Sequence, residues 1–298
     1  MSAGAASESH WSPAALEAVV DQRLRQLLPG EDEAPEILHR AMAYSLLARG
    51  KRMRPILALV TSFHLGQRDL RALDAGCAIE MVHAASLIMD DLPAMDDAEL
   101  RRGKPTVHRA FGVDVALLAS VALLNRAFGV VAASEGLPAE ARIKIVAVLA
   151  EAVGSRGLVG GQVLDLRARA ADMRASELEQ LNGMKTGALF VAAAAIGGIV
   201  AGASDTVVER LKQLGCELGL AFQIADDILD GAEFAHATGK DTGKDLTKPT
   251  LGSVLGPGGA RALFRDHADR CRAVLASLDA EHAPLGQFID QCLAQAKL

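Results

Sequence analysis

Aromatic side chains are scarce in this sequence, which has one Trp, one Tyr and eight Phe among its 298 residues. Few segments alternate apolar and polar residues with the period of a β-strand. Half of the residues are hydrophobic, and the abundant Ala is the best helix former. The composition therefore predicts an all-α fold, and the length suffices to bury a large core.

Long uncharged runs are also missing. The apolar run at residues 188–203 falls short of the roughly 20 residues that a spanning helix needs and contains three glycines. Residues 1–10 show no charged segment followed by an apolar one, so no secretory signal is predicted. We expect a buried core helix at 188–203, no stable membrane span, and disorder in residues 1–12.

Cysteine is sparse and scattered. The four thiols show no metal-ligand spacing, and each falls in an apolar helical stretch, so buried free thiols are expected: Cys77, Cys216, Cys271 and Cys292. Such thiols suit a reducing cytoplasm. The net charge of −6 argues against a nucleic-acid surface. It does not exclude a polyanionic substrate, because local basic groups and metal ions matter more than the total.

Carboxylates, by contrast, are concentrated at two places. In the first, four aspartates fall within residues 90–97, directly after an apolar helical run. Like charges this close raise one another's pKa, and a bound hard cation removes the conflict. Pro93 restricts the residue before it, so the helix is predicted to bulge or end near Leu92 and bring Asp96 back toward Asp90.

The second concentration is Asp226-Asp227-Ile-Leu-Asp230, which also follows an apolar helical run. Helical spacing places its three carboxylates on one face. Either cluster alone is compatible with a solvated acidic helix end. Two clusters with basic groups near each predict several metal ions facing a polyphosphate.

Basic residues gather at two further places. Gly50-Lys51-Arg52-Met53-Arg54-Pro55 opens a predicted helix, where free N–H groups together with Lys and Arg can bind phosphate. An exposed basic turn is the alternative. Arg101 and Arg102 follow the first aspartate cluster, and their planar donors suit phosphate oxygens. The alternative for this pair is two solvated arginines that balance nearby acidic residues.

These motifs resemble those of the trans-polyprenyl diphosphate synthases, from about Gly50 to Pro257. Asp90-Asp91-Leu-Pro-Ala-Met-Asp96-Asp97 with Arg101-Arg102-Gly is similar to the first aspartate-rich motif of that family, and Asp226-Asp227-Ile-Leu-Asp230 to the second. The similarity is greatest to bacterial geranylgeranyl diphosphate synthases of carotenoid pathways, with farnesyl diphosphate synthases next. It implies one domain over residues 1–298, a bundle of about a dozen helices around a deep central cavity, and a homodimer.

The resemblance also implies roles for individual residues. Two or three Mg²⁺ ions are expected on Asp90, Asp91, Asp96, Asp226, Asp227 and Asp230. The allylic diphosphate is expected on Arg101, Lys185, Thr186, Gln223 and Lys240, and isopentenyl diphosphate on Lys51, Arg54, His83 and Arg102. The roles of Lys244 and Lys248 stay open, because the loop length varies in the family.

Several of these assignments have a simpler structural alternative. A lone helical His such as His83 is more often a satisfied core residue, and Lys185 could be a solvated helix flank. Gly160-Gly161-Gln162 with Asp165 resembles the family's Gly-Gln-x-x-Asp pattern. Its glycines would permit close helix approach, while Gln162 could serve the cavity or make only a structural contact.

The implied reaction is magnesium-assisted ionisation of an allylic diphosphate (dimethylallyl, geranyl or farnesyl), followed by attack of isopentenyl diphosphate on the carbocation. Residues one turn or more before Asp90 should line the growing chain, namely Ala85, Ser86, Met81 and Val82. Farnesyl synthases of this type have an aromatic ring where Ala85 stands, so the expected product is C20 geranylgeranyl diphosphate.

Three other classes of protein are alternatives to such a prenyltransferase. A farnesyl diphosphate synthase is the first alternative. A terpene cyclase would leave the second basic site without a role and would normally have an aromatic-rich cavity. A catalytically silent regulatory subunit would be expected to lose an aspartate motif, whereas both are intact.

Overall fold

The computed structural model describes residues 12–168, 173–231, 249–280 and 283–294, without the side chain of Asp230. About three quarters of them are helical. The helices of the first half are α1 (Pro13–Leu27), α2 (Glu36–Leu46), α3 (Met53–His64), α4 (Leu73–Asp90), α5 (Val107–Phe111) and α6 (Val113–Ala132). Those of the second half are α7 (Ala139–Val153), α8 (Leu158–Arg167), α9 (Ala175–Asn182), α10 (Ala188–Val200), α11 (Asp205–Gly231), α12 (Leu251–Ser277) and α13 (Pro284–Ala294).

Two short elements complete the described fold. A π-helical turn, η2 (Gly183–Gly187), joins α9 to α10, and β1 (Leu100–Arg101) pairs antiparallel with β2 (Lys104–Pro105). The all-α prediction is confirmed.

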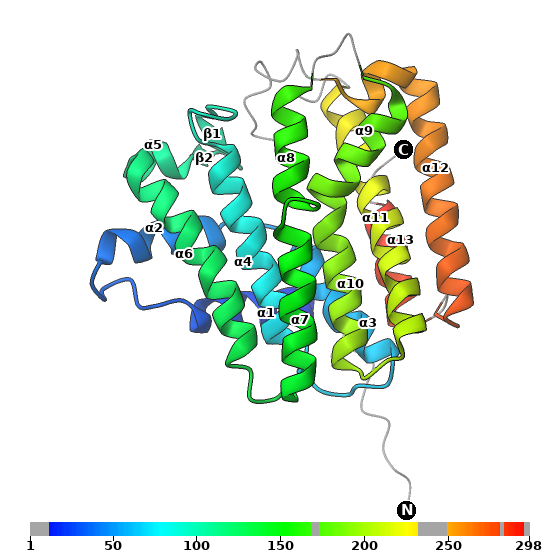
Figure 1. Ribbon diagram of the computed structural model, residues 1–298, viewed down its shortest axis with the longest axis horizontal. Helices are drawn as coiled ribbons and strands as arrows, with labels where there is room; N and C mark the ends of the chain where they lie inside the picture. The colour runs from blue at the N-terminus through cyan, green and yellow to red at the C-terminus, as the bar shows by residue number, and fades with distance from the viewer. Residues whose placement is uncertain (1–11, 169–172, 232–248, 281–282, 295–298) are drawn as a thin grey trace, which may run out of the picture.

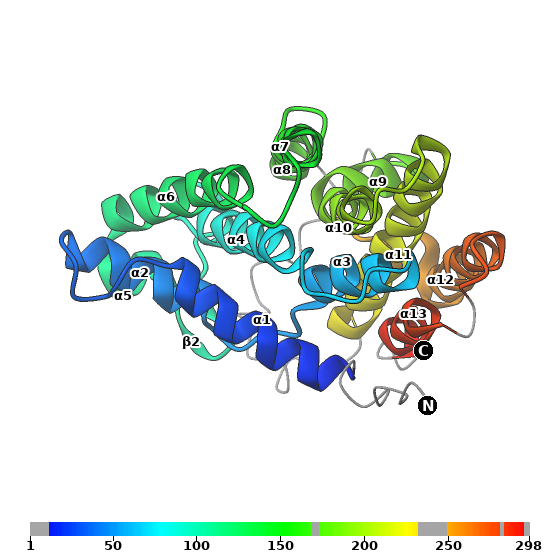
Figure 2. The same cartoon turned by 90° about the horizontal axis from the view of Figure 1, so that it is seen from below.

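The helices form an upright bundle (Figure 1). Helix α4 packs against α6, α3 and α10, and α10 in turn packs against α11, α3 and α7. Seen from below, α7 and α8 lie on one side of the bundle and α1 and α2 on the other (Figure 2). The buried side chains form one contiguous hydrophobic core, as a single domain requires; the division of the chain into domains otherwise stays a prediction.

Helices α4 and α10 occupy the centre because they are apolar on almost every side. Most residues of each are buried, without the polar stripe of a surface helix. Two described segments are long and apolar enough to cross a membrane by length and composition alone, Val113–Ala132 and Ala175–Val200. The second includes α10, and core helices of soluble proteins pass the same test. The predicted core helix at 188–203 is confirmed over Ala188–Val200.

Local sequence signals account for several helix ends. The Ser12 hydroxyl accepts a hydrogen bond from the Ala15 N–H, and Pro13 is the first residue of α1, as expected of a cap. The sequence did not predict α5, α9, η2 or the β1–β2 hairpin, which are too short for a periodic pattern. Helix α12 is kinked at Gly256, where φ is +69°.

The cysteines behave as predicted. All four are free, three of them are buried and Cys216 is partly buried. Burial raises the pKa of the Cys271 and Cys292 thiols to about 12. These thiols therefore stay protonated and pack as small apolar groups.

Candidate active site

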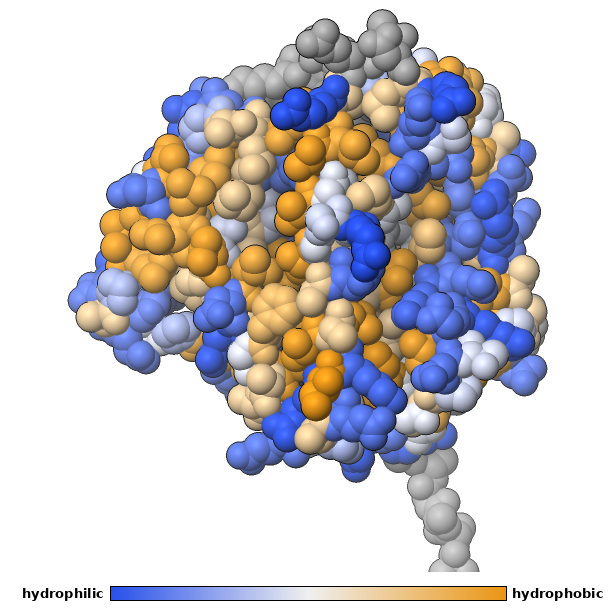
Figure 3. Space-filling model, viewed as in Figure 1, coloured by the Kyte–Doolittle hydropathy of each residue, from blue (hydrophilic) through white to orange (hydrophobic). Residues whose placement is uncertain are grey.

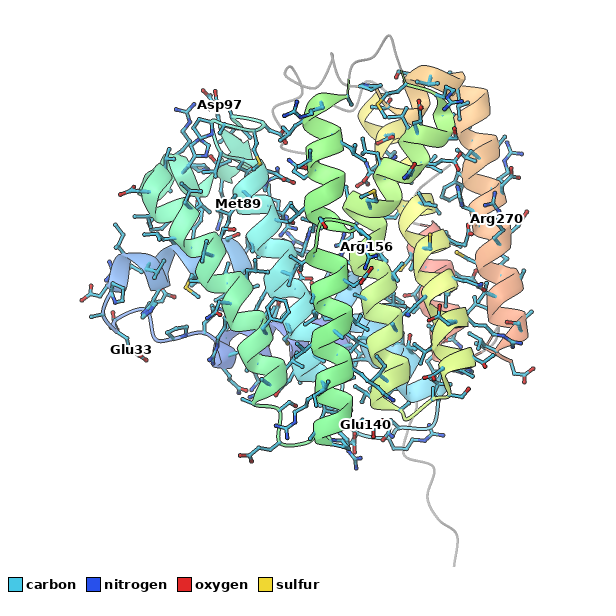
Figure 4. The ribbon with its side chains drawn as sticks, viewed as in Figure 1. Glu33, Met89, Asp97, Glu140, Arg156 and Arg270 are labelled. Atoms are coloured by element: carbon cyan, nitrogen blue, oxygen red, sulfur yellow. The ribbon has the colours of Figure 1, made fainter. Side chains whose placement is uncertain are left out.

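The first aspartate cluster lies where α4 ends. The helix stops at Asp90, and the Asp96 N–H donates to the Asp90 carbonyl at 2.9 Å, so the chain folds back as predicted. Asp97 has a left-handed backbone, φ +46°. It lies at the upper end of the bundle, and Glu140 lies at the lower end (Figure 4). Burial, with the nearby Asp96 carboxylate, raises the pKa of Asp90 to about 6, against the opposing effect of Lys185.

Asp91 and Arg101 form a close ion pair. The Arg101 Nε donates to both Asp91 carboxylate oxygens at 2.8 and 2.9 Å, and its Nη2 lies 2.6 Å from Oδ1. The Asp91 side chain is only 4% exposed. The sequence assigned these residues to metal and diphosphate respectively; the structure shows that Asp91 also fixes the guanidinium of Arg101.

Lys185 lies between two carboxylates from different helices. Its Nζ is 2.7 Å from Asp165 Oδ2 on α8 and 4.0 Å from Asp90 Oδ2 on α4. It therefore faces the site and is not a solvated flank. Asp165 was not assigned a role from the sequence, although the Gly-Gln-x-x-Asp pattern contained the signal.

Gly161 allows α8 to approach the backbone of Lys185. A Cβ at Gly161 would lie 2.5 Å from the Lys185 backbone N and 2.8 Å from its Cα. The prediction that these glycines permit close approach is thus confirmed. Gln162 is buried, with its Nε2 3.6 Å from the Met95 sulfur, and its Oε1 has no hydrogen-bond partner in the described part of the chain.

A hydrogen-bond chain links η2 to the second aspartate cluster. The Thr186 hydroxyl donates to Gln223 Oε1 at 2.8 Å, and Gln223 Nε2 donates to Asp227 Oδ1 at 2.9 Å. The Leu251 N–H donates to the other Asp227 oxygen at 3.3 Å. Because both ends of its amide are used, Gln223 is held in one orientation.

The three aspartates of the second cluster lie on one continuous helix. Asp226, Asp227 and Asp230 all belong to α11, which is helical through Gly231, as the spacing predicted. Lys240, Lys244 and Lys248 lie outside the described residues.

The predicted isopentenyl diphosphate residues lie near two packed aromatic rings. The Arg54 guanidinium carbon is 4.5 Å from the centroid of Phe190, and the Lys51 Nζ is 5.9 Å from that of Phe222. The Arg54 Nε is buried and has no hydrogen-bond partner among the described residues. A buried donor of this kind calls for an acceptor, which a diphosphate oxygen would provide.

His83 and Arg102 belong to the same cationic surroundings. Burial, and then the charges of Arg54, Arg102 and Arg101, hold the pKa of His83 well below 6.5. The imidazole is therefore neutral near pH 7. A Cβ on Gly50 would lie 2.9 Å from the Arg102 Nη1, so this guanidinium passes close to the glycine.

Unlike its basic neighbours Lys51 and Arg54, Arg52 is buried in ion pairs. The sequence did not reveal this difference. Its side chain is 3% exposed, with Nε 2.7 Å from Asp21 and Nη1 2.9 Å from Glu80. Its Nη2 donates to the Ala48 carbonyl at 2.8 Å. Arg52 thus joins α1, α4 and the start of α3, and serves the structure of the loop that carries Lys51 and Arg54.

The residues predicted to set the product chain length lie on α4, on the N-terminal side of Asp90. Met81, Val82 and Ala85 are buried, and Ser86 is partly exposed. The Ser86 hydroxyl donates to the His83 carbonyl at 2.8 Å, and the Ser120 hydroxyl of α6 to the Ala85 carbonyl at 2.9 Å. Their role in product length stays a prediction.

The chain is similar in sequence and in structure to known proteins. The family model described as polyprenyl synthetase matches residues 35–255. A geranylgeranyl diphosphate synthase of Pantoea ananas is 45% identical over 254 residues, which are 85% of this chain and 83% of that protein. An FPP/GFPP synthase from Zymomonas mobilis superposes with a TM-score of 0.82 at 32% identity and covers 96% of both chains.

A geranyltransferase from Helicobacter pylori, complexed with magnesium and isoprenyl diphosphate, has a TM-score of 0.87 at 26% identity over 99% of both chains. The fold and the site thus define a helical prenyltransferase. The chain belongs to the polyprenyl synthetase family. The prediction of a prenyltransferase of the geranylgeranyl diphosphate synthase type is confirmed by these relatives.

Proposed function

We propose that the chain joins isopentenyl diphosphate to an allylic diphosphate and releases C20 geranylgeranyl diphosphate. The observation that carries the proposal is the presence of two separate sets of cationic side chains. Lys185 and Arg101 lie beside the aspartates of α4. Arg54 and Lys51 lie over the rings of Phe190 and Phe222. A reaction between two diphosphates needs two such anion sites.

We propose Mg²⁺ as the cofactor, in two or three ions held by the two aspartate clusters. No group of three acidic, His or Cys side chains in the described part of the chain forms a complete metal site. Mg²⁺ does not need one, because it takes one or two carboxylates with water and phosphate oxygens. Burial and the nearby Asp96 carboxylate raise the pKa of Asp90, and a divalent cation would offset both effects. When bound, the metal neutralises charge on the leaving diphosphate.

Different residues of the chain bind the two substrates. Lys185 and Arg101 hold the allylic diphosphate through charge-assisted hydrogen bonds. The Thr186 hydroxyl and the Gln223 amide present oriented dipoles next to the reacting carbon. Lys51, Arg54 and Arg102 hold isopentenyl diphosphate, and neutral His83 adds a hydrogen bond. Positioning of the two substrates supplies much of the rate increase.

The product length is tested at Ala85. Replacing Ala85 by Phe puts an aromatic ring into a tightly packed section of α4 and should shorten the main product from C20 to C15. Product chain length is measured by chromatography after incubation with Mg²⁺, isopentenyl diphosphate and farnesyl diphosphate. An unchanged C20 product from Ala85→Phe would show that the chain does not pass this residue.

The same incubation of the unmodified protein separates the alternative functions. Elongation of farnesyl diphosphate to C20 supports the proposal. Formation of C15 from shorter primers without elongation of farnesyl diphosphate would identify a farnesyl diphosphate synthase. No turnover with any primer would favour a catalytically silent subunit.

We also propose a homodimer that uses the outer face of α6. Leu117, Leu118 and Val121 are 40%, 60% and 61% exposed at helical spacing, and apolar surface gathers over α6 (Figure 3). A second copy of the chain would bury this stripe. Sedimentation of Val121→Asp should show monomers where the unmodified protein gives dimers.

The free thiols favour a cytoplasmic location, and the family resemblance favours a role in carotenoid synthesis.

A further inference from the structure

The hairpin that carries Arg101 and Arg102 cannot be stable on its own. Each strand has two residues, with Leu100 opposite Pro105 and Arg101 opposite Lys104. Pro105 has no N–H to donate, and two-stranded hairpins are marginal in water. The turn residues Arg102 and Gly103 both have left-handed backbones, φ +53° and +75°. This matches the preferred two-residue hairpin turn, but the conformation is unfavourable for Arg102 because it is not glycine.

Contacts other than the strand pairing must therefore hold the hairpin in place. At its base, the Thr106 hydroxyl donates to the Ala98 carbonyl at 2.8 Å. On the β1 strand, Arg101 is held by Asp91. On the β2 strand, the Tyr44 hydroxyl of α2 donates to the Pro105 carbonyl at 2.8 Å.

Tyr44 joins its own helix α2 to two other elements, β2 and α5. Its ring packs edge-on against Phe111 of α5, with centroids 5.3 Å apart and an interplanar angle of 74°. The Lys104 Nζ lies 5.9 Å from the centre of the same ring. It is the only tyrosine in the sequence, and a phenylalanine could supply the ring contacts but not the hydroxyl donor.

We propose that Tyr44 is a positioning residue that holds the β1–β2 hairpin against α2 and so sets the reach of Arg102 toward isopentenyl diphosphate. The inference rests on the proposed function. Arg101 has a second anchor in Asp91, whereas Arg102 lies in the turn, beyond the last paired residues of the hairpin. Loss of the Tyr44 contacts therefore weakens binding at the Arg102 site more than at the Arg101 site.

The expected effect is selective for one substrate. A hydrogen bond of this kind changes an equilibrium by roughly two- to tenfold. Apparent affinity falls with the fraction of molecules whose hairpin is docked. Tyr44→Phe should therefore raise the KM for isopentenyl diphosphate about two- to tenfold, and Tyr44→Ala more. The KM for the allylic substrate and kcat should stay within about twofold.

The test measures KM for each substrate in turn, in the wild type, Tyr44→Phe and Tyr44→Ala. The matched control is Arg210→Met, which removes another exposed side-chain donor to a backbone carbonyl, from Arg210 Nη1 to Ser277 at 2.9 Å, between α11 and the end of α12. Hydrogen exchange of the peptide covering residues 98–106 is followed in parallel and does not depend on turnover.

A selective rise in the KM for isopentenyl diphosphate, with faster exchange at residues 98–106 in Tyr44→Phe, supports the anchor. Equal rises for both substrates, no rise, or unchanged exchange would overturn it. A wild-type protein without turnover would refute the proposed function, and the exchange comparison would then still decide whether Tyr44 anchors the hairpin.

Discussion

Replacement of Gly161 by Ala would test how α8 positions the ammonium group at the site. The added Cβ would lie 2.5 Å from the Lys185 backbone N and 2.8 Å from its Cα, whereas ordinary contact begins at 3.4 Å. Backbone atoms cannot rotate away as a side-chain end can. Helix α8 and η2 must therefore separate by about 1 Å, and Lys185 moves with its backbone relative to Asp165 and Asp90.

The two consequences of this change differ in size. Overpacking costs about 1–3 kcal/mol, and the better helix propensity of Ala offsets about 1 kcal/mol of it. The free energy of unfolding should thus fall by no more than about 2 kcal/mol. A displacement of about 1 Å at a positioned group can lower turnover about 100-fold. We expect kcat to fall by about 10- to 100-fold in a protein that remains folded.

The assay is kcat at saturating substrate and Mg²⁺, with thermal unfolding measured on the same samples. The matched control is Gly258→Ala, a helical position on α12 where an added Cβ meets no atom within 4 Å. It should keep the wild-type kcat and gain up to about 1 kcal/mol of stability. A wild-type kcat in Gly161→Ala would refute the claim that the α8–η2 contact places Lys185.

Three further outcomes are expected. Arg52→Met leaves the Glu80 carboxylate buried without its cation and should lower the free energy of unfolding in urea by about 3–5 kcal/mol; a loss below about 1 kcal/mol would contradict this role. Asp165→Asn weakens the 2.7 Å contact of Lys185 and should lower kcat about tenfold, and an unchanged kcat would mean that η2 alone places the lysine. Because the pKa of His83 is lowered, the folded state binds fewer protons than the unfolded chain below about pH 6.5. The free energy of unfolding therefore falls as the pH decreases through this range, by up to about 1.4 kcal/mol per pH unit. His83→Gln should lose less stability than the wild type between about pH 7.5 and 5.5, and equal losses would show that His83 is not buried uncharged.

Much of the site could be predicted because its residues are close in sequence or lie at helical spacing. Pro93 made a break near Leu92 predictable, and the structure ends α4 at Asp90. The spacing of Asp226 and Asp227 with Asp230 required only a continuous helix. Local sterics and helix periodicity are properties of short segments, so they can be read without the fold.

Contacts between distant segments could not be predicted in this way. Arg52 is two residues from Arg54 and has the same chemistry, yet it is buried against Asp21 and Glu80. The β1–β2 hairpin carries no alternating pattern, because its strands have only two residues each. Its placement depends on Tyr44, more than fifty residues earlier in the chain.

The sequence by itself therefore determined the helical class, the two aspartate clusters and the breaks around them, since composition and residue spacing act locally. The tertiary structure decided which charges meet. It paired Lys185 with Asp165, Arg101 with Asp91 and Gln223 with Thr186. These pairs join separate elements, so they form only when the elements pack at fixed distances, and packing is set by the whole core and not by any one segment.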